Sequence, residues 1–409
     1  MEIHKAKEWQ RPGEKQQKQV FEKTSIILNE IREKGADGID EFSLKFDGFR
    51  PYVIPLKPFE AYPLDDSEKS AIRLAAQRIT TFAKLQRTAY RDVEITDSCG
   101  TFGHKVLPLD SMVAYIPGGR FPLISTALMT LIPAKVAGVE RRVAFSPSDH
   151  PAIQAAASLA GATEMWRIGG VQAMATAAFG YRNFPPVDMV VGPGNAFVNA
   201  AKALLQSTLK IDTLAGPSEL LILADKEADP NWVCLDMLAQ AEHDPQALSV
   251  LCSNDTSLLH TVKTKLEAAA KDAESVGIGV VHLVHADRIE DMIHLSNRMA
   301  PEHLHVNAAS NFLDPSHLKN YGSLFLGPLS AVALGDYCSG PNHTLPTSGY
   351  AQKKGGLHVG DFLKVLTYQE VHAEGMKRLA KTGISLAQQE GLKNHSKSLA
   401  IRCDLPLAN

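Results

Sequence analysis

The sequence predicts an α/β protein with two similar Rossmann-like lobes, each a parallel sheet covered by helices. From residue 113 to about residue 299, short runs rich in β-branched residues alternate with segments whose apolar residues recur at helical spacing. The alternation is interrupted once, near residue 216, by the stretch KIDTLAGPSELLILAD. The length of 409 residues also favours two or three domains over one.

The part of the chain before the lobes is expected to be mostly helical. Residues 12–90 contain QVFEKTSIILNEIREKG and SEKSAIRLAAQRITTFAKLQ, in which apolar residues recur at helical spacing. The first segment stops at Gly35, and Ser67 is placed to cap the second. A polar, turn-rich stretch follows to about residue 110. We therefore assign residues 1–112 to an N-terminal helical region that packs on the lobe expected at 219–360.

Two series of β and α segments account for the lobes. The first series runs from SMVAYIP to AFVNAAKALLQ, and the second runs from SELLILAD to a helix at 287–299. Because helices that connect parallel strands cover the faces of the sheet, we expect one lobe at 113–218 and another at 219–360. Residues 361–409 are expected to form a helical tail without further strands.

Three glycine turns follow predicted strands of the first lobe. PGG at 117–119, IGG at 168–170 and GPGN at 192–195 each come at the carboxyl end of a strand, where open parallel sheets bind ligands. A helix that starts there can hold phosphate through its free N–H groups. The pattern GxGxxG is absent from the sequence, so tight βα connections are an equally simple interpretation of the turns.

Two pairs of neighbouring residues could carry chemistry. Gln240 and His243 are three apart at the end of a predicted helix and would share one of its faces. An imidazole nitrogen is a good zinc ligand and an amide oxygen a weaker one, although polar pairs also occur on hydrated helix ends. Glu302 and His303 are adjacent before a predicted strand, which suits two proton transfers by different groups. A turn with two hydrated side chains is the alternative.

A loop and the tail contain further candidates. The loop GDYCSGPNHTLPTSG at 335–349 carries Asp336 and His343, and long loops of this composition are often functional. Glu390 and His395 come close in sequence near a predicted helix start. The patterns HExxH, GxSxG and Walker A are absent from the sequence, which argues against a zincin protease, an α/β-hydrolase and a P-loop kinase.

The composition narrows the class of protein. The chain is 44% hydrophobic and 21% charged, with a formal net charge of −3, as is usual for globular proteins. No block of Lys or Arg suggests nucleic acid or an anionic membrane, and no apolar run is long enough to span a bilayer. The five scattered cysteines and the polar N-terminus favour a reducing compartment. We expect a cytoplasmic protein that binds neither nucleic acid nor membrane.

Ten short motifs, taken together, resemble the histidinol dehydrogenase family. They run in the family's order over nearly the whole chain, which makes the combination specific although each motif is short. The motifs are FDG (46–48), YIPGG (115–119), IPAKVAGV (132–139), GGVQA (169–173), VGPGN (191–195), AGPSE (215–219), AQAEHD (239–244), APEHL (300–304), GDYCSGPNHTLPT (335–347) and EGLKNH (390–395).

The resemblance implies a zinc-dependent, NAD-linked homodimer with an aldehyde-dehydrogenase-like fold. Such an enzyme oxidises L-histidinol through L-histidinal to L-histidine, the last step of histidine biosynthesis. The lobe at 113–218 would bind NAD, and the lobe at 219–360 would carry the zinc and catalytic residues. The implied zinc ligands are Gln240, His243, Asp336 and, from the tail of the partner subunit, His395. The implied catalytic pair is Glu302 and His303, the other substrate contacts are Ser218, His343 and Glu390, and the NAD contacts are Tyr115, Gln172 and Asn195.

Several departures from the family pattern leave alternatives open. GGLHVGDF has Gly355 and His358 where the family has serine, and Arg120 after YIPGG is unusual. A paralogue that oxidises another small primary alcohol, such as a sulfonated diol, is the first alternative, although His343 and Glu390 suit an imidazole and an amine better. A silent binding protein would lack one of the catalytic pair, and a zinc hydrolase would need no NAD.

Overall fold

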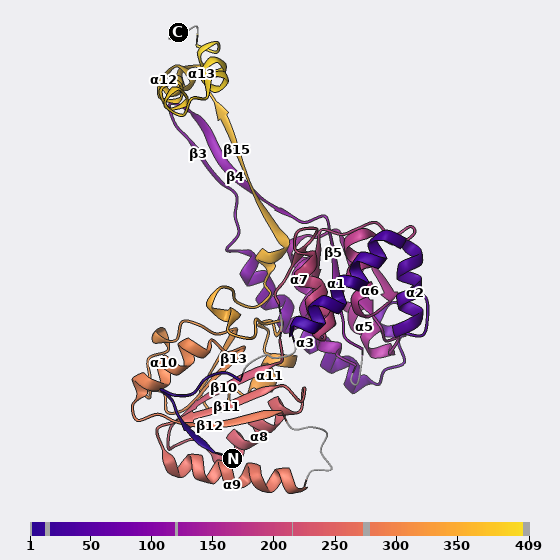
Figure 1. The fold of residues 1–409 in the computed structure, drawn as a ribbon, viewed down its shortest axis with the longest axis vertical. Helices are drawn as coiled ribbons and strands as arrows, with labels where there is room; N and C mark the ends of the chain where they lie inside the picture. Colours follow the sequence, from indigo (N-terminus) through magenta and orange to yellow (C-terminus); the bar gives the residue numbers. More distant parts are fainter. Residues whose placement is uncertain (1, 13–16, 119–121, 215, 273–278, 404–409) are drawn as a thin grey trace. The chain divides into compact units, whose positions relative to one another are not determined.

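The computed structural model describes residues 2–12, 17–118, 122–214, 216–272 and 279–403 (Figure 1). Its strands form two six-stranded sheets and one three-stranded sheet, so the predicted α/β class is confirmed. The contacts divide the chain into unit 1, Met1–Arg87 with Leu109–Phe362, and unit 2, Thr88–Pro108 with Leu363–Asn409. Arg120, one of the departures noted above, lies outside the described residues.

Sheet I is a parallel sheet with the strand order β1-β12-β11-β10-β13-β14. Side chains of β10 alternate between its two faces: Leu220 and Ile222 pack with α8 and α9, and Leu221 and Leu223 pack with α10. A buried parallel strand of this kind is apolar on both faces. The elements are β1 (Ile3–Lys5), β10 (Glu219–Ala224), α8 (Pro230–Ala241), β11 (Leu248–Ser253), α9 (Thr256–Asp272), β12 (Val280–His285), α10 (Ile289–Met299), β13 (His303–Asn307), β14 (Ser323–Leu326) and α11 (Val332–Tyr337).

Sheet II has the strand order β2-β7-β6-β5-β8-β9 and is parallel except for β2. Helices α1, α2, α6 and α7 pack together on one face, and α4 contacts α3, α5 and the strands β5 and β6. The elements are α1 (Gln17–Lys34), α2 (Ala36–Phe46), β2 (Tyr52–Val53), α3 (Asp66–Arg87), β5 (Ser111–Tyr115), α4 (Ile124–Ala137), β6 (Arg141–Ser146), α5 (Pro151–Ala160), β7 (Glu164–Arg167), α6 (Gly170–Phe179), β8 (Met189–Val191), α7 (Ala196–Leu205) and β9 (Lys210–Ile211).

Unit 2 differs from what the sequence predicted. The tail was expected to contain no strand, but Leu363–Val371 forms β15, and the turn-rich stretch before residue 110 contains β3 (Val93–Thr96) and β4 (Gly100–Pro108). The three strands form the antiparallel sheet III, in the order β15-β4-β3, and α12 (Ala373–Gln389) and α13 (Lys393–Ala400) follow β15 (Figure 1). The prediction failed because β3 and β15 are mostly exposed and leave no buried apolar face in the sequence.

The start of α12 is tied closely to sheet III. Gly375 lies so close to the backbone of Cys99 that a Cβ atom there would overlap its carbonyl oxygen. Residues 88–108 and the tail therefore pack as one body, although more than 250 residues separate them in the sequence. The division into four parts at residues 112, 218 and 360 stays a prediction. It did not include the packing of residues 88–108 with the tail.

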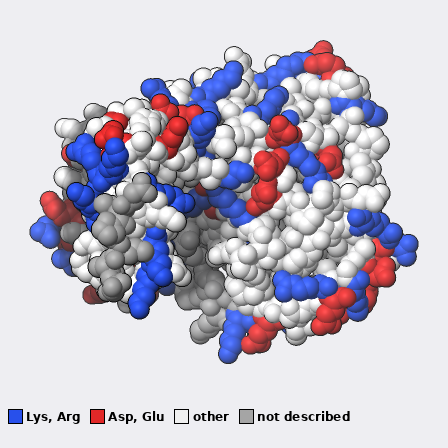
Figure 2. Space-filling model, turned by 90° about the horizontal axis from the view of Figure 1, so that it is seen from above, with Lys and Arg blue, Asp and Glu red and all other residues white. Residues whose placement is uncertain are grey.

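The surface and the helices agree with a chain of mixed charge. On the face drawn in Figure 2, Lys and Arg are interspersed with Asp and Glu. In the described part of the chain, each helix is too short or too polar to cross a bilayer.

Candidate active site

Glu302 and His303 lie at the amino end of β13, between β10 and β14 in sheet I. Their side chains are 8% and 6% exposed. The sequence placed them in a loop that enters a strand, and the structure makes His303 the first residue of that strand. The alternative of a turn with two hydrated side chains therefore does not fit the fold, because both groups are buried.

The backbone of Glu219, the first residue of β10, holds both side chains. Its N–H donates to Oε2 of Glu302 over 2.8 Å, and its carbonyl oxygen lies 3.1 Å from Nδ1 of His303. Because a carbonyl oxygen can only accept, Nδ1 carries the hydrogen in this bond. The other ring nitrogen, Nε2, is then unprotonated in the neutral imidazole, and it lies 3.7 Å from Oδ1 of Asp336.

His303 is held as a neutral base. Its pKa is lowered to about 4, chiefly by burial; the charge of Asp336 opposes this shift, and the nearby His243 and His343 add to it. At neutral pH the imidazole is therefore uncharged and able to accept a proton at Nε2.

Glu302 is shifted in the opposite direction. Burial and then the charge of Asp336 raise its pKa well above the ordinary value, and a hydrogen bond with the side chain of Ser218 opposes this shift. A carboxylate with a raised pKa is a stronger base toward water than an ordinary glutamate. Two neighbouring residues with pKa values displaced in opposite directions are typical of an acid–base site.

Asp336 connects the loop 335–349 to this pair. It lies in α11, and its side chain is 22% exposed. His343 turns back so that its Nδ1 donates to the backbone carbonyl of Asp336 over 2.7 Å. Burial lowers the pKa of His343. The carboxylate thus lies among imidazoles that are neutral rather than cationic.

Gln240 and His243 are not on one helix as predicted. Helix α8 ends at Ala241 with Glu242 as its C-cap, so His243 lies beyond the helix and is exposed. The cause is Pro245, because the residue before a proline avoids the helical conformation and helices end ahead of it. The N–H of His243 still reaches the carbonyl of Gln240 over 3.4 Å, which keeps the two residues one turn apart.

The proposed ligands are only partly assembled in one unit. Among the described residues, no group of three or more His, Cys, Asp or Glu side chains is arranged to hold a metal ion. Gln240 is of another type, and Nε2 of its buried amide has no hydrogen-bond partner among the described residues. Glu390 and His395 are both exposed and belong to unit 2. The structure therefore places Ser218, His243 and His343 near Asp336 and the pair Glu302 and His303. The two tail residues belong to the other unit.

The predicted NAD residues lie at the carboxyl ends of strands in sheet II. The hydroxyl of Tyr115 accepts from the N–H of Gly170 over 3.2 Å, and burial raises the pKa of Tyr115 to about 12. Gln172 donates from Nε2 to Asp47 over 2.8 Å, while its Oε1 is buried without a partner among the described residues. Asn195 is exposed and caps α7, accepting from two backbone N–H groups through Oδ1.

Sequence reasoning missed two residues, Arg11 and Asp47, that bind site residues and keep them in place. Arg11 forms an ion pair with the carboxylate of Glu219, with side chains 22% and 5% exposed, and its Nη2 donates to the carbonyl of Met299 over 2.5 Å. Asp47, in the FDG motif, accepts from Gln172 and from the N–H of Gly169. The available signal was an acidic residue directly before a buried apolar strand, as in SELLILA.

Removing the guanidinium of Arg11 tests whether Glu219 depends on it. Arg11→Met leaves a buried carboxylate unpaired and is expected to lower the free energy of unfolding by about 3 kcal/mol, measured by urea denaturation. Adding Glu219→Gln should recover most of the loss. As a control, Lys5→Met breaks an exposed pair with Asp287, whose side chains are 56% and 60% exposed, and should cost less than about 1 kcal/mol. Equal losses in the two single variants would contradict this role.

Comparisons with known proteins show the family of the chain. A family model described as histidinol dehydrogenase matches residues 10–403. Histidinol dehydrogenase 1 of a Nostoc species is 39% identical over 92% of this chain and 90% of its own length. The histidinol dehydrogenase of Methanothermobacter thermautotrophicus is 42% identical over 92% of each chain. A crystal structure of histidinol dehydrogenase from Elizabethkingia anophelis has a TM-score of 0.86 at 30% identity and covers 98% of this chain and 94% of that one. The chain belongs to the histidinol dehydrogenase family.

Proposed function

We propose that this chain oxidises L-histidinol through L-histidinal to L-histidine in the cytoplasm, with two NAD molecules per turnover. The observation that carries the proposal is the buried pair Glu302 and His303, held by one backbone residue with opposite pKa displacements. The names of the relatives support the choice of substrate, because each is a histidinol dehydrogenase.

The first half-reaction converts the alcohol to the aldehyde. His303 takes the hydroxyl proton at Nε2, because its Nδ1 is already occupied by the carbonyl of Glu219. When bound, NAD would supply the acceptor for the hydride that leaves the same carbon in each of the two steps. The products are histidinal, NADH and one proton, so the charges and electrons balance.

The second half-reaction needs water. Glu302 removes a proton from a water molecule that adds to the aldehyde carbon, and His303 returns the proton taken in the first half-reaction to the aldehyde oxygen, which gives the hydrate. His303 then takes a hydroxyl proton again as the second hydride leaves, and the acid forms. Both residues lie in a buried site, which retains the reactive aldehyde between the steps. Using one site for both oxidations avoids the release of that aldehyde.

The donor groups of unit 1 fit zinc. Gln240 offers an amide, His243 an imidazole and Asp336 a carboxylate, and zinc accepts all three kinds of ligand. The amide of Gln240 is buried with an unpartnered nitrogen among the described residues, and an amide can turn so that its oxygen takes that place. When bound, zinc would hold the amine and imidazole of the substrate rather than activate water. Ser218, His343 and Glu390 are the proposed further contacts to the substrate.

The proposed NAD site lies beside the glycine turns of sheet II. Tyr115, Gln172 and Asn195 are its proposed contacts, and the buried oxygen of Gln172 is a polar atom with no protein partner in the described chain. At the N-terminus of α7, Oδ1 of Asn195 already accepts the N–H groups of Phe197 and Val198, so the proposed contact to the cofactor there is the side chain of Asn195.

We further propose that two copies of the chain share their active sites. Unit 1 supplies three of the four proposed zinc ligands, and a fourth is needed for a closed shell. His395 is exposed on α13, where another molecule can reach it. In this proposal the tail of one subunit completes the site of the other.

The substrate is tested with purified, zinc-loaded protein and NAD, offered either L-histidinol or a sulfonated diol. The proposal predicts two NADH per histidinol consumed, and no more than a trace of NADH with the diol. NADH formed only with the diol would make the chain a paralogue with another substrate, and turnover without NAD would indicate a hydrolase.

The two catalytic residues are expected to affect the half-reactions differently. His303→Asn should slow both hydride transfers by about 10²–10⁴-fold, because each needs a proton acceptor. Glu302→Gln should slow histidinal oxidation much more than histidinol oxidation, as single-turnover NADH formation from each substrate can show. His305→Asn changes a buried histidine on the same face of β13 and serves as the control. Equal losses in both half-reactions for Glu302→Gln would contradict the division of roles.

Sharing of sites is tested with subunits that each lack one ligand. His243→Ala and His395→Ala homodimers should both lose zinc and activity. A heterodimer of the two, isolated with different tags, contains one intact site if the ligands come from different chains, so about half of the wild-type activity should return. An inactive heterodimer would mean that all four ligands come from one chain.

A further inference from the structure

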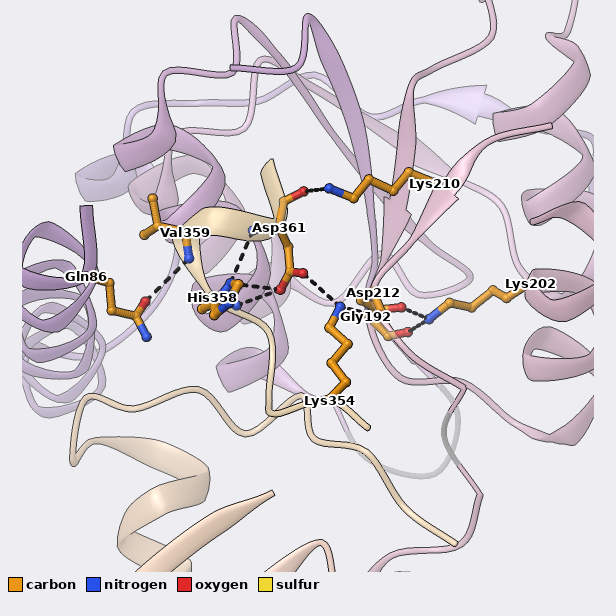
Figure 3. Close-up of polar contacts among 9 residues, drawn as sticks. All are labelled: Gln86, Gly192, Lys202, Lys210, Asp212, Lys354, His358, Val359 and Asp361. Carbon is orange, nitrogen blue, oxygen red and sulfur yellow. Dashed lines mark hydrogen bonds and ion pairs between the residues drawn. The ribbon is translucent and has the colours of Figure 1, made fainter. Parts of the chain in front are cut away.

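Two charged side chains that the proposed mechanism does not use are buried beside sheet II. Lys202 lies on α7, Asp212 follows β9, and each side chain is 1% exposed. The ammonium and the carboxylate form an ion pair (Figure 3). Removing two charges from water costs free energy that pairing only partly returns. The pair therefore stabilises the fold little by itself, and its other contacts are more informative.

Both members of the pair also hold Gly192. The ammonium of Lys202 donates to the carbonyl oxygen of Gly192 over 2.9 Å, and the N–H of Gly192 donates to Oδ2 of Asp212 over 2.7 Å. Gly192 has a φ of 113°, and a Cβ atom there would overlap the carbonyl oxygen of Tyr115. Both polar groups of this residue are thus fixed by side-chain charges, and its other side packs against the end of β5.

The residue held in this way begins the turn 192–195. The turn connects the carboxyl end of β8 to Asn195, the N-cap of α7. β8 pairs with β5, whose last residue, Tyr115, also bonds the glycine turn at Gly170. Two of the three glycine turns therefore meet at Tyr115, and the shape of the turn 192–195 determines the place of Asn195, a second proposed NAD contact.

The pair is joined to a second segment, 353–362. The ammonium of Lys354 donates to the carbonyl oxygen of Asp212 over 2.5 Å and to Oδ1 of Asp361 over 2.8 Å, and Lys210 bonds the carbonyl oxygen of Asp361 (Figure 3). His358 and Asp361 bond each other's backbone N–H groups, as a capping box does. Burial alone would raise the pKa of Asp361, but the hydrogen bond from His358 and the charge of Lys354 lower it to about 2. The carboxylate that binds Lys354 is therefore ionised at neutral pH.

We propose that Lys202 and Asp212 are positioning residues for dinucleotide binding. They hold the turn 192–195 open for the cofactor, and Lys354 joins Asp212, which holds that turn, to the segment 353–362. This inference rests on the proposed function, because it assumes that the turn binds NAD. It assigns no chemical step to either residue.

The test removes the pair without leaving a charge unpaired. In Lys202→Met/Asp212→Leu, two apolar side chains replace the ion pair, and such replacements often preserve stability. The dissociation constant of NADH, followed by its fluorescence, should rise at least about tenfold. The rate of histidinol oxidation at saturating NAD should fall less than about threefold, and the KM for histidinol should stay unchanged.

A second ion pair of the same lobe provides the matched control. Arg141 and Glu164 are paired over 2.9 Å at the amino ends of β6 and β7, and the side chains are 22% and 36% exposed. Because the glycine turns lie at the opposite ends of the strands, Arg141→Met should change the melting temperature without changing the dissociation constant of NADH. Lys354→Met should raise that constant by a smaller factor than the double variant.

A folded double variant that binds NADH within about twofold of the wild type would overturn the inference. If the double variant does not fold, Asp212→Asn carries the test, since it keeps the shape and one acceptor oxygen. An unchanged dissociation constant in Asp212→Asn would then overturn it, and a rise of about threefold or more would support it. Wild-type protein that binds no NADH would instead overturn the proposed function, together with everything that rests on it.

Discussion

The backbone of Glu219 is the constraint on which the site depends. A buried N–H or carbonyl group without a partner costs about 1–3 kcal/mol, so the start of β10 needs the side chains of Glu302 and His303 as much as they need it. This mutual requirement orients both groups and fixes the tautomer of the imidazole. Arg11 forms an ion pair with Glu219. A residue of the N-terminal segment therefore supports Glu302 and His303, which lie nearly 300 positions away in the sequence.

The electrostatics follow from the same burial. Desolvation keeps His303 neutral and makes Glu302 more basic, and Asp336 adds a negative charge beside both. In the described part of the chain, the carboxylate of Asp336 has no ion pair with Lys or Arg. A site with an uncompensated carboxylate, neutral imidazoles and a buried amide supports the proposal of a bound divalent cation, because such a cation would compensate the charge and use each of these donors.

The sequence predicted the fold class and the strand that begins beside Glu302 and His303 better than it predicted the supporting structure. The inner strands of sheets I and II, such as β10, β11 and β13, are buried and leave a strong apolar pattern, whereas β15 and β3 are largely exposed and leave none. Gln240 and His243 were placed on one helix because their spacing fits, but Pro245 ends the helix before the second residue. Spacing identifies neighbours on a helix, and it cannot show a contact made through a backbone atom of a distant strand, as at Glu219. Lys202 lies in the predicted helical segment AFVNAAKALLQ, and nothing in that segment shows that this one lysine is buried.

The central claim is that Gln240, His243 and Asp336 of one chain and His395 of a second chain surround one zinc ion beside the catalytic pair. Anomalous diffraction at the zinc edge, from crystals grown with zinc and L-histidinol, tests it most directly. The account predicts one zinc peak per chain, bonded to those four residues, with the imidazole of the substrate in contact and its hydroxyl within hydrogen-bond distance of Nε2 of His303. A zinc peak away from Asp336, or one completed by residues of a single chain, would contradict the account.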